Sequence, residues 1–175
     1  MHSSETQELK QAIRTIPDFP KKGILFRDIT PLLTDKDKFK YCIDSFVSSI
    51  KEEIDIVISI ESRGFILGSA LAYALGAGFV PIRKEGKLPF HTFSTSYDLE
   101  YGKAEIEIHQ DALKRGAKVI LIDDVLATGG TVEAAIHLAE KLGGDIRGIY
   151  FLIELLDLKG RKRLKDYPIH SLISY

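Results

Sequence analysis

The chain of 175 residues contains a single cysteine, Cys42. One thiol excludes a disulfide within the chain and a metal cluster held by several thiolates. Cys42 shares an apolar helical face with Phe39, Phe46 and Ile50. We therefore expect a buried core residue at this position rather than a reactive thiol.

The chain also lacks an excess of either charge, because 24 Lys and Arg residues nearly balance 25 Asp and Glu residues, for a net charge of −1. This balance excludes a broad basic face for nucleic acid or an anionic membrane, so any anion site must be local. No apolar run approaches the roughly 18 residues of a membrane-spanning helix, and the first residues lack an apolar signal segment. We therefore expect a cytoplasmic protein with no nucleic-acid partner and no membrane partner.

The most informative stretch is 119–131, where four apolar residues run into Asp123 and Asp124 and then into a loop with two glycines. The apolar run predicts a strand covered on both faces, and parallel sheets of such strands bind ligands at their carboxyl ends. The loop offers backbone N–H groups, hydroxyls and a helix N-terminus, which together suit a monophosphate. It consists of Ala127, Thr128, Gly129, Gly130 and Thr131.

Two carboxylates directly before a phosphate loop need partners other than phosphate. Asp123 and Asp124 suit hydroxyl groups, or Mg²⁺ held through water, and a ribose 5-phosphate offers hydroxyls beside its phosphate. The stretch lacks both the lysine of a Walker loop and the G-x-G-x-x-G spacing, so nucleoside triphosphate and dinucleotide sites are weak alternatives. A further alternative is an acidic turn in which Thr131 caps the following helix.

Two other predicted strands also end in polar loops. The strand at 54–60 is followed by Glu61, Ser62 and Arg63, whose N–H groups and guanidinium suit a second anionic group. The strand at 79–83 runs into a basic cluster that ends at Lys87. A helix cap with a surface arginine and a solvated basic loop are the respective alternatives.

Strands alternate with helices along most of the chain, which predicts a doubly wound, mostly parallel α/β sheet with flanking helices. The predicted helices span 5–16, 35–50, 65–75 and 132–142, and a last long strand spans 149–156. We expect a single domain, 1–175, with no internal linker. An antiparallel arm, about 90–109, is inserted with one wet face and a mobile tip, and the irregular apolar segment 19–31 is expected to cover a ligand.

The stretch 119–131 closely resembles the 5-phosphoribosyl pyrophosphate (PRPP) signature of type I phosphoribosyltransferases. The chain from Ile16 onward also resembles the adenine phosphoribosyltransferase family in several separate motifs that occur in the same order. These motifs are Phe19-Pro20, Gly23-Ile24, Phe26 to Pro31, Glu61 to Phe65, Ile82 to Pro89, Ser96 to Lys103 and Glu154 to Arg161.

The resemblance implies a type I phosphoribosyltransferase fold in which residues 1–34 form a small hood over the base site. It implies transfer of the phosphoribosyl group from PRPP to adenine, which gives AMP and pyrophosphate in purine salvage. Mg²⁺ would be carried by PRPP and bridged through water to Asp123 and Asp124, with no direct protein ligand. The family also suggests a homodimer.

Residue roles follow from the same resemblance. The loop 127–131 would hold the 5′-phosphate, and Asp123 and Asp124 the ribose hydroxyls. Glu61, Ser62 and Arg63 would form the pyrophosphate loop, while Arg63 and Lys87 would counter the charge of the leaving group as catalytic residues.

The resemblance also assigns the base site and the arm. Leu25, Phe26 and Arg27 would bind adenine, and Val125 stands opposite the base where relatives often carry leucine. On the arm, Glu100 would be the catalytic acid or base, beside the substrate-binding Tyr101.

Two alternatives remain open for the function. The first is a hypoxanthine or guanine phosphoribosyltransferase, in which the hydrogen-bond pattern at position 6 of the purine is reversed. The second is a PRPP-binding regulator without catalysis, which would be expected to carry a nucleic-acid-binding element that the sequence does not offer.

Overall fold

A computed structural model describes residues 3–99 and 102–175. The chain divides into two compact units, Met1–Ser49 and Ile50–Tyr175. The single domain with a hood and an arm, expected from the sequence, stays a prediction.

The first unit contains a small antiparallel sheet that the sequence did not predict, in which Ile16 of β1 pairs with Phe26 of β2. The predicted helix 5–16 is therefore wrong at its end, because Thr15 and Ile16 are β-branched and Ile16 precedes a proline, which disfavours helical backbone. The irregular segment predicted over 19–31 is likewise wrong where it contains β2. The elements are α1 (Ser3–Gln11), β1 (Arg14–Pro17), β2 (Leu25–Asp28), α2 (Thr30–Thr34) and α3 (Lys36–Ser49).

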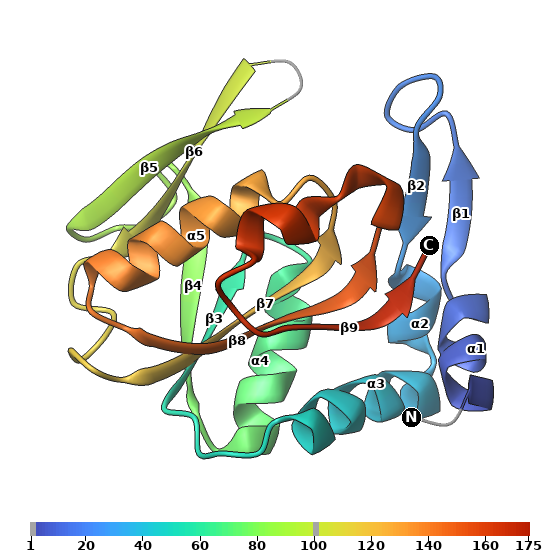
Figure 1. The fold of residues 1–175 in the computed structure, drawn as a ribbon, viewed down its shortest axis with the longest axis horizontal. Coiled ribbons are helices and arrows are strands. Elements are labelled where there is room, and N and C mark those ends of the chain that lie inside the picture. The colour runs from blue at the N-terminus through green and yellow to red at the C-terminus, as the bar shows by residue number, and fades with distance from the viewer. Residues whose placement is uncertain (1–2, 100–101) are drawn as a thin grey trace. The chain divides into compact units, whose positions relative to one another are not determined.

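The second unit is built on a seven-stranded sheet in the order β5-β6-β4-β3-β7-β8-β9 (Figure 1). The strands from β4 to β9 in this order pair in parallel, whereas β6 pairs antiparallel with β4 and β5. Its elements are β3 (Ile56–Ile60), α4 (Gly64–Leu75), β4 (Gly78–Lys84), β5 (Thr92–Leu99), β6 (Gly102–His109), β7 (Lys118–Leu126), α5 (Gly130–Lys141), β8 (Asp145–Glu154), η1 (Leu156–Leu158), η2 (Gly160–Leu164) and β9 (Ile169–Ser174). The predicted mostly parallel α/β sheet with its antiparallel arm is confirmed, and β9 is an addition from the apolar tail.

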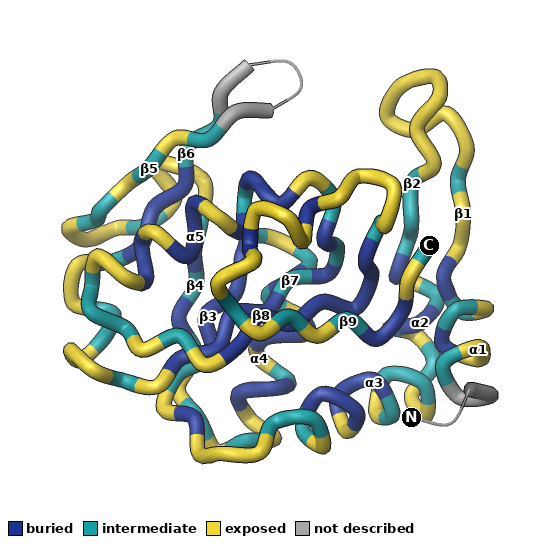
Figure 2. Tube along the Cα trace, in the orientation of Figure 1, coloured by how far each residue is buried: buried dark blue, intermediate teal, exposed yellow. Residues whose placement is uncertain are grey.

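Helices α4 and α5 cover opposite faces of this sheet. Ile58 and Ile60 belong to the buried cluster that includes the inner side of α5. Ser59 points to the other face, where it lies against Gly64 and Gly68 of α4. Neighbouring strand residues alternate between faces, and Figure 2 accordingly shows the central strands buried along most of their lengths.

Candidate functional site

The strand order reverses between β3 and β7. From β3 the chain crosses to β4 on one side, whereas from β7 it crosses to β8 and then β9 on the other. Parallel α/β sheets bind ligands in the crevice beyond the carboxyl ends of the strands at such a reversal. The loops that follow β3 and β7, residues 61–64 and 127–131, flank this position.

The loop after β7 leads directly into α5, which begins at Gly130. Gly129 has φ +86°, a left-handed conformation that glycine adopts without strain. Together with Asp123 and Val125, the loop lines a small cavity of about 60 Å³. A cavity of this size beside the first turn of a helix suits one small anionic group.

Asp123 and Asp124 lie within β7 rather than beyond it. The strand continues to Leu126, past the apolar run from which it was predicted, because its pairing with β8 extends to Glu154. The backbone N–H of Asp124 donates to Oδ1 of Asp123 at 2.9 Å. The two side chains therefore sit at the open end of the strand, next to the cavity of the loop.

The two aspartates are poorly compensated as anions. Asp124 is only 5% exposed and pairs with Nε of Arg63 at 2.9 Å. Burial raises the pKa of Asp124 even though the charge of Arg63 opposes the shift. Burial, followed by the charge of Asp124, raises the pKa of Asp123 well above its usual 3.8. Hydrogen-bond donors on a ligand would stabilise the charged forms that the protein alone leaves costly.

The loop after β3 approaches Asp123 closely because Gly64 has no side chain. A methyl group at Gly64 would lie 2.7 Å from Oδ1 of Asp123 and 2.9 Å from Oγ of Ser59. The Ser59 hydroxyl in turn donates to the carbonyl of Ile122 at 3.0 Å. Small residues thus bring the Arg63 loop against the aspartate pair.

Glu61 connects this loop to the end of β4. Its carboxylate accepts from Nε and Nη2 of Arg83 at 3.2 and 3.1 Å and from the backbone N–H of Lys84 at 3.2 Å. The hydrogen bonds from Arg83 are the main cause of the lowered pKa of Glu61. The structure therefore engages the Glu61 side chain with Arg83, which the sequence placed only within a basic cluster.

Glu107 is a second residue that the sequence analysis missed. The sequence predicted one wet face for the arm, with no buried carboxylate, but Glu107 of β6 is only 4% exposed. Its carboxylate accepts the backbone N–H groups of Lys87 and Leu88 at 2.9 and 2.8 Å, so the loop after β4 folds over it. Only this long-range contact, which has no local pattern, distinguishes it from Glu105.

The residues assigned to the base site lie on β2 in the first unit. Leu25 is 55% exposed, and the ring of Phe26 meets Phe19 edge to face with centroids 5.1 Å apart. Arg27 donates from Nη1 to the hydroxyl of Thr15 on β1. The antiparallel pairing of β1 with β2 therefore holds the three residues on one short strand.

The remaining residues to which the sequence assigned a role include three exposed side chains and two positions outside the described residues. Ser62, Lys87 and Thr128 are exposed. Glu100 and Tyr101 lie outside the described residues. The structure thus brings together 61–64, 83–88 and 123–131 within the second unit and holds 25–27 within the first.

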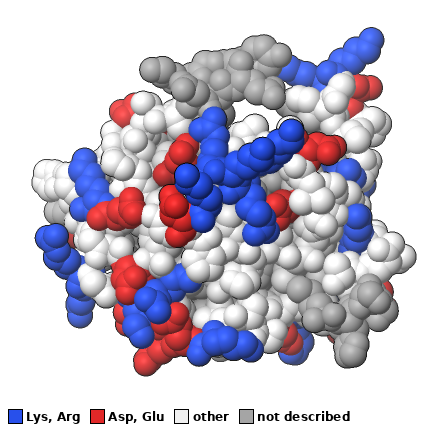
Figure 3. All heavy atoms as spheres, viewed as in Figure 1, with Lys and Arg blue, Asp and Glu red and all other residues white. Residues whose placement is uncertain are grey.

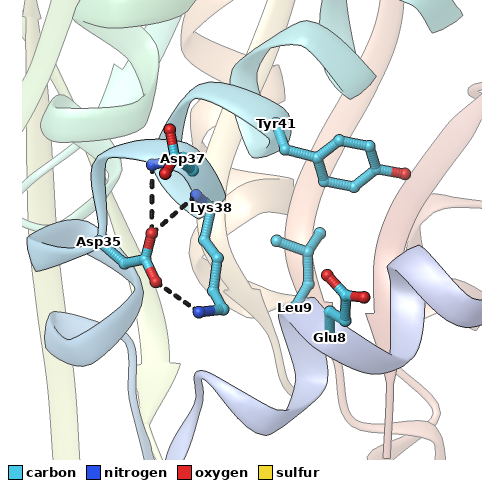
Figure 4. A pocket seen from close by; sticks show the side chains of 6 residues that line it. All are labelled: Glu8, Leu9, Asp35, Asp37, Lys38 and Tyr41. Carbon is cyan, nitrogen blue, oxygen red and sulfur yellow. Dashed lines mark hydrogen bonds and ion pairs between the residues drawn. The ribbon is translucent and has the colours of Figure 1, made fainter.

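A larger cavity, of about 310 Å³, lies within the first unit between α1 and the start of α3 (Figure 4). Asp35, one of its lining residues, interacts with two of the others. Asp35 accepts the backbone N–H groups of Asp37 and Lys38, both at 3.1 Å, and its side chain pairs with that of Lys38. This is the capping of a helix N-terminus, and it carries no chemistry of the kind predicted for the site.

Basic and acidic side chains are interspersed on the visible face, with a local basic group over η2 (Figure 3). Within the described residues, no group of three His, Cys, Asp or Glu side chains is arranged to hold a metal ion. None of the described helices has the length and apolar character needed to cross a membrane.

Comparison with known proteins gives a consistent result. Residues 34–173 match the model of the phosphoribosyl transferase domain. An adenine phosphoribosyltransferase of Halothermothrix orenii is 58% identical over 167 residues, which cover 95% of this chain and 98% of that protein.

Solved structures agree with the sequence comparison. The adenine phosphoribosyltransferase of Thermoanaerobacter pseudethanolicus superposes with a TM-score of 0.95 at 51% identity, covering 97% of this chain and 99% of its own. The Saccharomyces cerevisiae enzyme, crystallised with adenine and an iminoaltritol bisphosphate, gives 0.94 at 42% identity, covering 98% and 99%.

Proposed function

Because the chain belongs to the adenine phosphoribosyltransferase family, we propose that it transfers the phosphoribosyl group of PRPP to adenine, releasing pyrophosphate and forming AMP for purine salvage. One observation carries this proposal beyond the family. An anion-sized cavity and an arginine-bearing loop flank the same pair of aspartates at the strand reversal. PRPP presents a phosphate, a pair of hydroxyls and a diphosphate in a matching sequence.

In this proposal the loop 127–131 binds the 5′-phosphate through its backbone and the hydroxyls of Thr128 and Thr131. Asp123 and Asp124 accept hydrogen bonds from the ribose hydroxyls. Donors from the ligand stabilise carboxylates whose pKa values burial has raised, so binding and ionisation of the pair support each other.

The diphosphate is assigned to the loop after β3 and to Lys87. Arg63 pairs with Asp124 at 2.9 Å, so it is already beside the position at which negative charge would develop. As the C1′–O bond to pyrophosphate breaks, Arg63 and Lys87 stabilise the leaving group and the aspartates lie near the positive ribose. Glu61 and Ser62 shape this loop, with Glu61 held by Arg83.

Mg²⁺ fits this site as an ion carried by the substrate. Two adjacent carboxylates are oxygen donors of the type Mg²⁺ prefers, but they are too few for a complete protein cage, and Mg²⁺ commonly retains water and substrate phosphates as ligands. When bound, the ion would neutralise charge on the diphosphate. Asp123 and Asp124 would contact it through water.

Adenine is assigned to Leu25, Phe26 and Arg27 of the hood, residues 1–34, with Val125 at the opposite face of the base. Backbone groups would read the purine edge, and the ring of Phe26 would stack on it. A 6-oxopurine reverses the donor at position 6, which is why we favour adenine over hypoxanthine or guanine.

The arm, about residues 90–109, is proposed to close over the ribose and exclude water, which would otherwise compete with N9 of the base. Glu100 would exchange a proton with the base, and Tyr101 would contact the substrate. We further propose a single-domain protomer, a homodimer as the working assembly, and the cytoplasm as its location.

The direct test is a rate assay with PRPP, Mg²⁺ and, in turn, adenine, hypoxanthine and guanine. We expect kcat/KM for adenine to exceed the values for both oxopurines by about 10⁴, because mispaired buried polar groups are costly. Comparable values for adenine and hypoxanthine would contradict the base assignment. PRPP binding without turnover of any base would favour the regulator alternative.

A further inference from the structure

The segment after β8, residues 155–164, overlaps the family-like stretch Glu154 to Arg161 but has no part in the proposed reaction. It begins beside the loop after β7, where the backbone N–H of Leu155 donates to the carbonyl of Leu126 at 2.9 Å. It then passes close to the start of α5, as the dark red segment of Figure 1 shows. The geometry at Gly160 indicates what this contact does.

Gly160 lies directly against the backbone of the phosphate loop. A methyl group at Gly160 would lie 2.2 Å from the carbonyl oxygen of Ala127 and 3.1 Å from its carbonyl carbon. The φ angle of Gly160 is not in the left-handed region, so an L-residue could adopt this backbone. The reason for glycine here is therefore steric, and any side chain would have to displace Ala127.

The contact is reciprocal. A methyl group at Gly129 would lie 2.9 Å from the carbonyl oxygen of Gly160. The two glycines pack backbone to backbone, with Ala127 and Gly129 on one side and Gly160 on the other. Ala127 and Gly129 also line the small cavity.

Gly160 is itself held in place by the neighbouring arginine. Arg161 donates from Nε and Nη2 to the buried carboxylate of Glu154 at 2.8 and 2.6 Å, and from Nη1 to the carbonyl of Ile169 at 3.1 Å. The hydroxyl of Ser171 completes the cluster with a 2.8 Å hydrogen bond to Glu154. This fork ties the segment to β8 and β9 in one geometry.

A second attachment fixes the far end of the segment. Leu164 is 1% exposed in the core, and Nη1 of Arg163 pairs with Glu133 in the first turn of α5 at 2.9 Å. The segment is thus anchored on both sides of Gly160 and cannot move away from the loop without breaking these contacts.

We propose that Gly160, fixed by the Glu154–Arg161 fork, is a positioning residue that sets the backbone of Ala127 to Gly129 for binding the 5′-phosphate. This inference rests on the proposed assignment of the loop to that phosphate. It predicts selective loss of phosphate binding when the contact is disturbed, because a displacement of about 1 Å in a positioning element can cost up to 10²-fold.

The test compares Gly160→Ala with the parent by calorimetric titration of two probes, ribose 5-phosphate and Mg²⁺-pyrophosphate. We expect the Kd for ribose 5-phosphate to rise about tenfold or more, while the Kd for pyrophosphate changes less than about twofold. In steady-state assays KM for PRPP should rise while KM for adenine stays within about twofold. A purely structural role would not separate the two probes.

Gly144→Ala is the matched control. It also adds a methyl group near a backbone carbonyl, 3.2 Å from that of Ala139, but at the other end of α5. Both Kd values should remain those of the parent. Thermal melts of each variant identify any general loss of stability.

If Gly160→Ala yields no folded protein, the same two titrations are made with Arg161→Lys and Arg161→Gln. Lysine keeps the charge but not the fork, so the Kd for ribose 5-phosphate should rise in the order parent, Lys, Gln, with pyrophosphate binding unchanged. Parent-like ribose 5-phosphate binding, or equal loss of both probes, in the variants that fold would overturn the proposal. A parent that does not bind ribose 5-phosphate would instead overturn the assignment of the loop, and with it this inference.

Discussion

The second unit contains two kinds of buried carboxylate, and they differ in what compensates them. Glu154 accepts two hydrogen bonds from Arg161, which are the main cause of its lowered pKa. Burial works to raise the pKa of Glu107, but the backbone N–H groups of Leu88 and Lys87 outweigh it and leave the pKa lowered. Asp124 is buried and Asp123 is half-buried beside it, yet the pKa values of both are raised.

The difference separates structural acids from ligand-binding acids. A carboxylate that the protein fully satisfies stabilises the fold, whereas one left short of donors costs stability until something else supplies them. Such under-compensated acids cluster at functional sites. The comparison predicts opposite effects of neutralising the two kinds.

The largest effect on the rate is expected from Glu100, which in the proposed function exchanges a proton with the base. Glu100→Gln should lower the single-turnover rate by roughly 10² to 10⁴, because proton transfer contributes in the transition state, while PRPP affinity changes little. Rapid-quench measurement is required, since slow product release can hide a chemical defect. A single-turnover rate within about threefold of the parent would remove Glu100 from the mechanism.

Asp123→Asn should separate activity from stability. Loss of a charge-assisted hydrogen bond, worth about 1.5–3 kcal/mol, should weaken PRPP binding roughly 10- to 100-fold. The thermal midpoint at pH 7 should equal or exceed that of the parent, because the variant removes the repulsion between the carboxylates of Asp123 and Asp124. Calorimetry with PRPP and a thermal melt measure the two effects. A variant that binds PRPP as the parent does would show that the carboxylate does not serve the ribose.

Glu107→Gln should behave in the opposite way. It weakens two charge-assisted hydrogen bonds to the loop after β4, so we expect a loss of about 1–2 kcal/mol in the free energy of unfolding. Denaturant titration measures the loss. Glu105→Gln is the control with a smaller expected loss, because Glu105 lies on the same face of β6 but is less buried. An increase in stability would break the distinction drawn between the two kinds of acid.

The same distinction predicts a difference in pH dependence. Because the folded-state pKa of Asp123 is raised above 3.8, the folded protein binds more protons than the unfolded chain, and stability falls as pH rises from 3.8 through the raised value. Glu107 and Glu154 have lowered pKa values, so their stabilisation is present above 4.5 and is lost as pH falls through the folded-state values. Asp123→Asn should reduce the loss of stability as pH rises and leave unchanged the loss of stability as pH falls. Thermal melts from about pH 4, near the ordinary pKa of Asp, to about pH 8 measure how the thermal midpoint changes with pH. An unchanged slope in the variant would contradict the raised pKa of Asp123.

The smallest effect is expected from the surface pair of Arg147 and Glu52, which are 3.0 Å apart. Solvent screens this pair, so Arg147→Gln should leave the thermal midpoint nearly unchanged. A large decrease would mean that ion pairs stabilise this protein without burial.

Local patterns predicted much of this structure. The apolar runs that became β3 and β7, and the glycine-bearing loop at 127–131, are contiguous in sequence and were found from it. Asp123 and Asp124 were singled out because two charges interrupt such a run. These features depend on neighbouring residues, which a single sequence displays.

Features that depend on distant residues were not predictable in this way. The pairing of β1 with β2, the burial of Glu107 and the contact of Gly160 with Ala127 each join segments whose relation the sequence does not display. The sequence predicted a helix that continues to Ile16, whereas pairing with Phe26 places Ile16 in strand β1. The missing information lay in the register and packing of the fold.

Strand β9 also has a consequence for how the chain is made. Because β9 follows β8 in the sequence, Ser171 of β9 emerges from the ribosome after β8 and Arg161. Ribosomes add about 5–20 residues per second, which sets the length of this delay. Until β9 docks, the newly made chain presents β8 as an open strand edge, and open edges pair readily with other chains. The edge of β8 is therefore open during the interval between the emergence of β8 and the docking of β9.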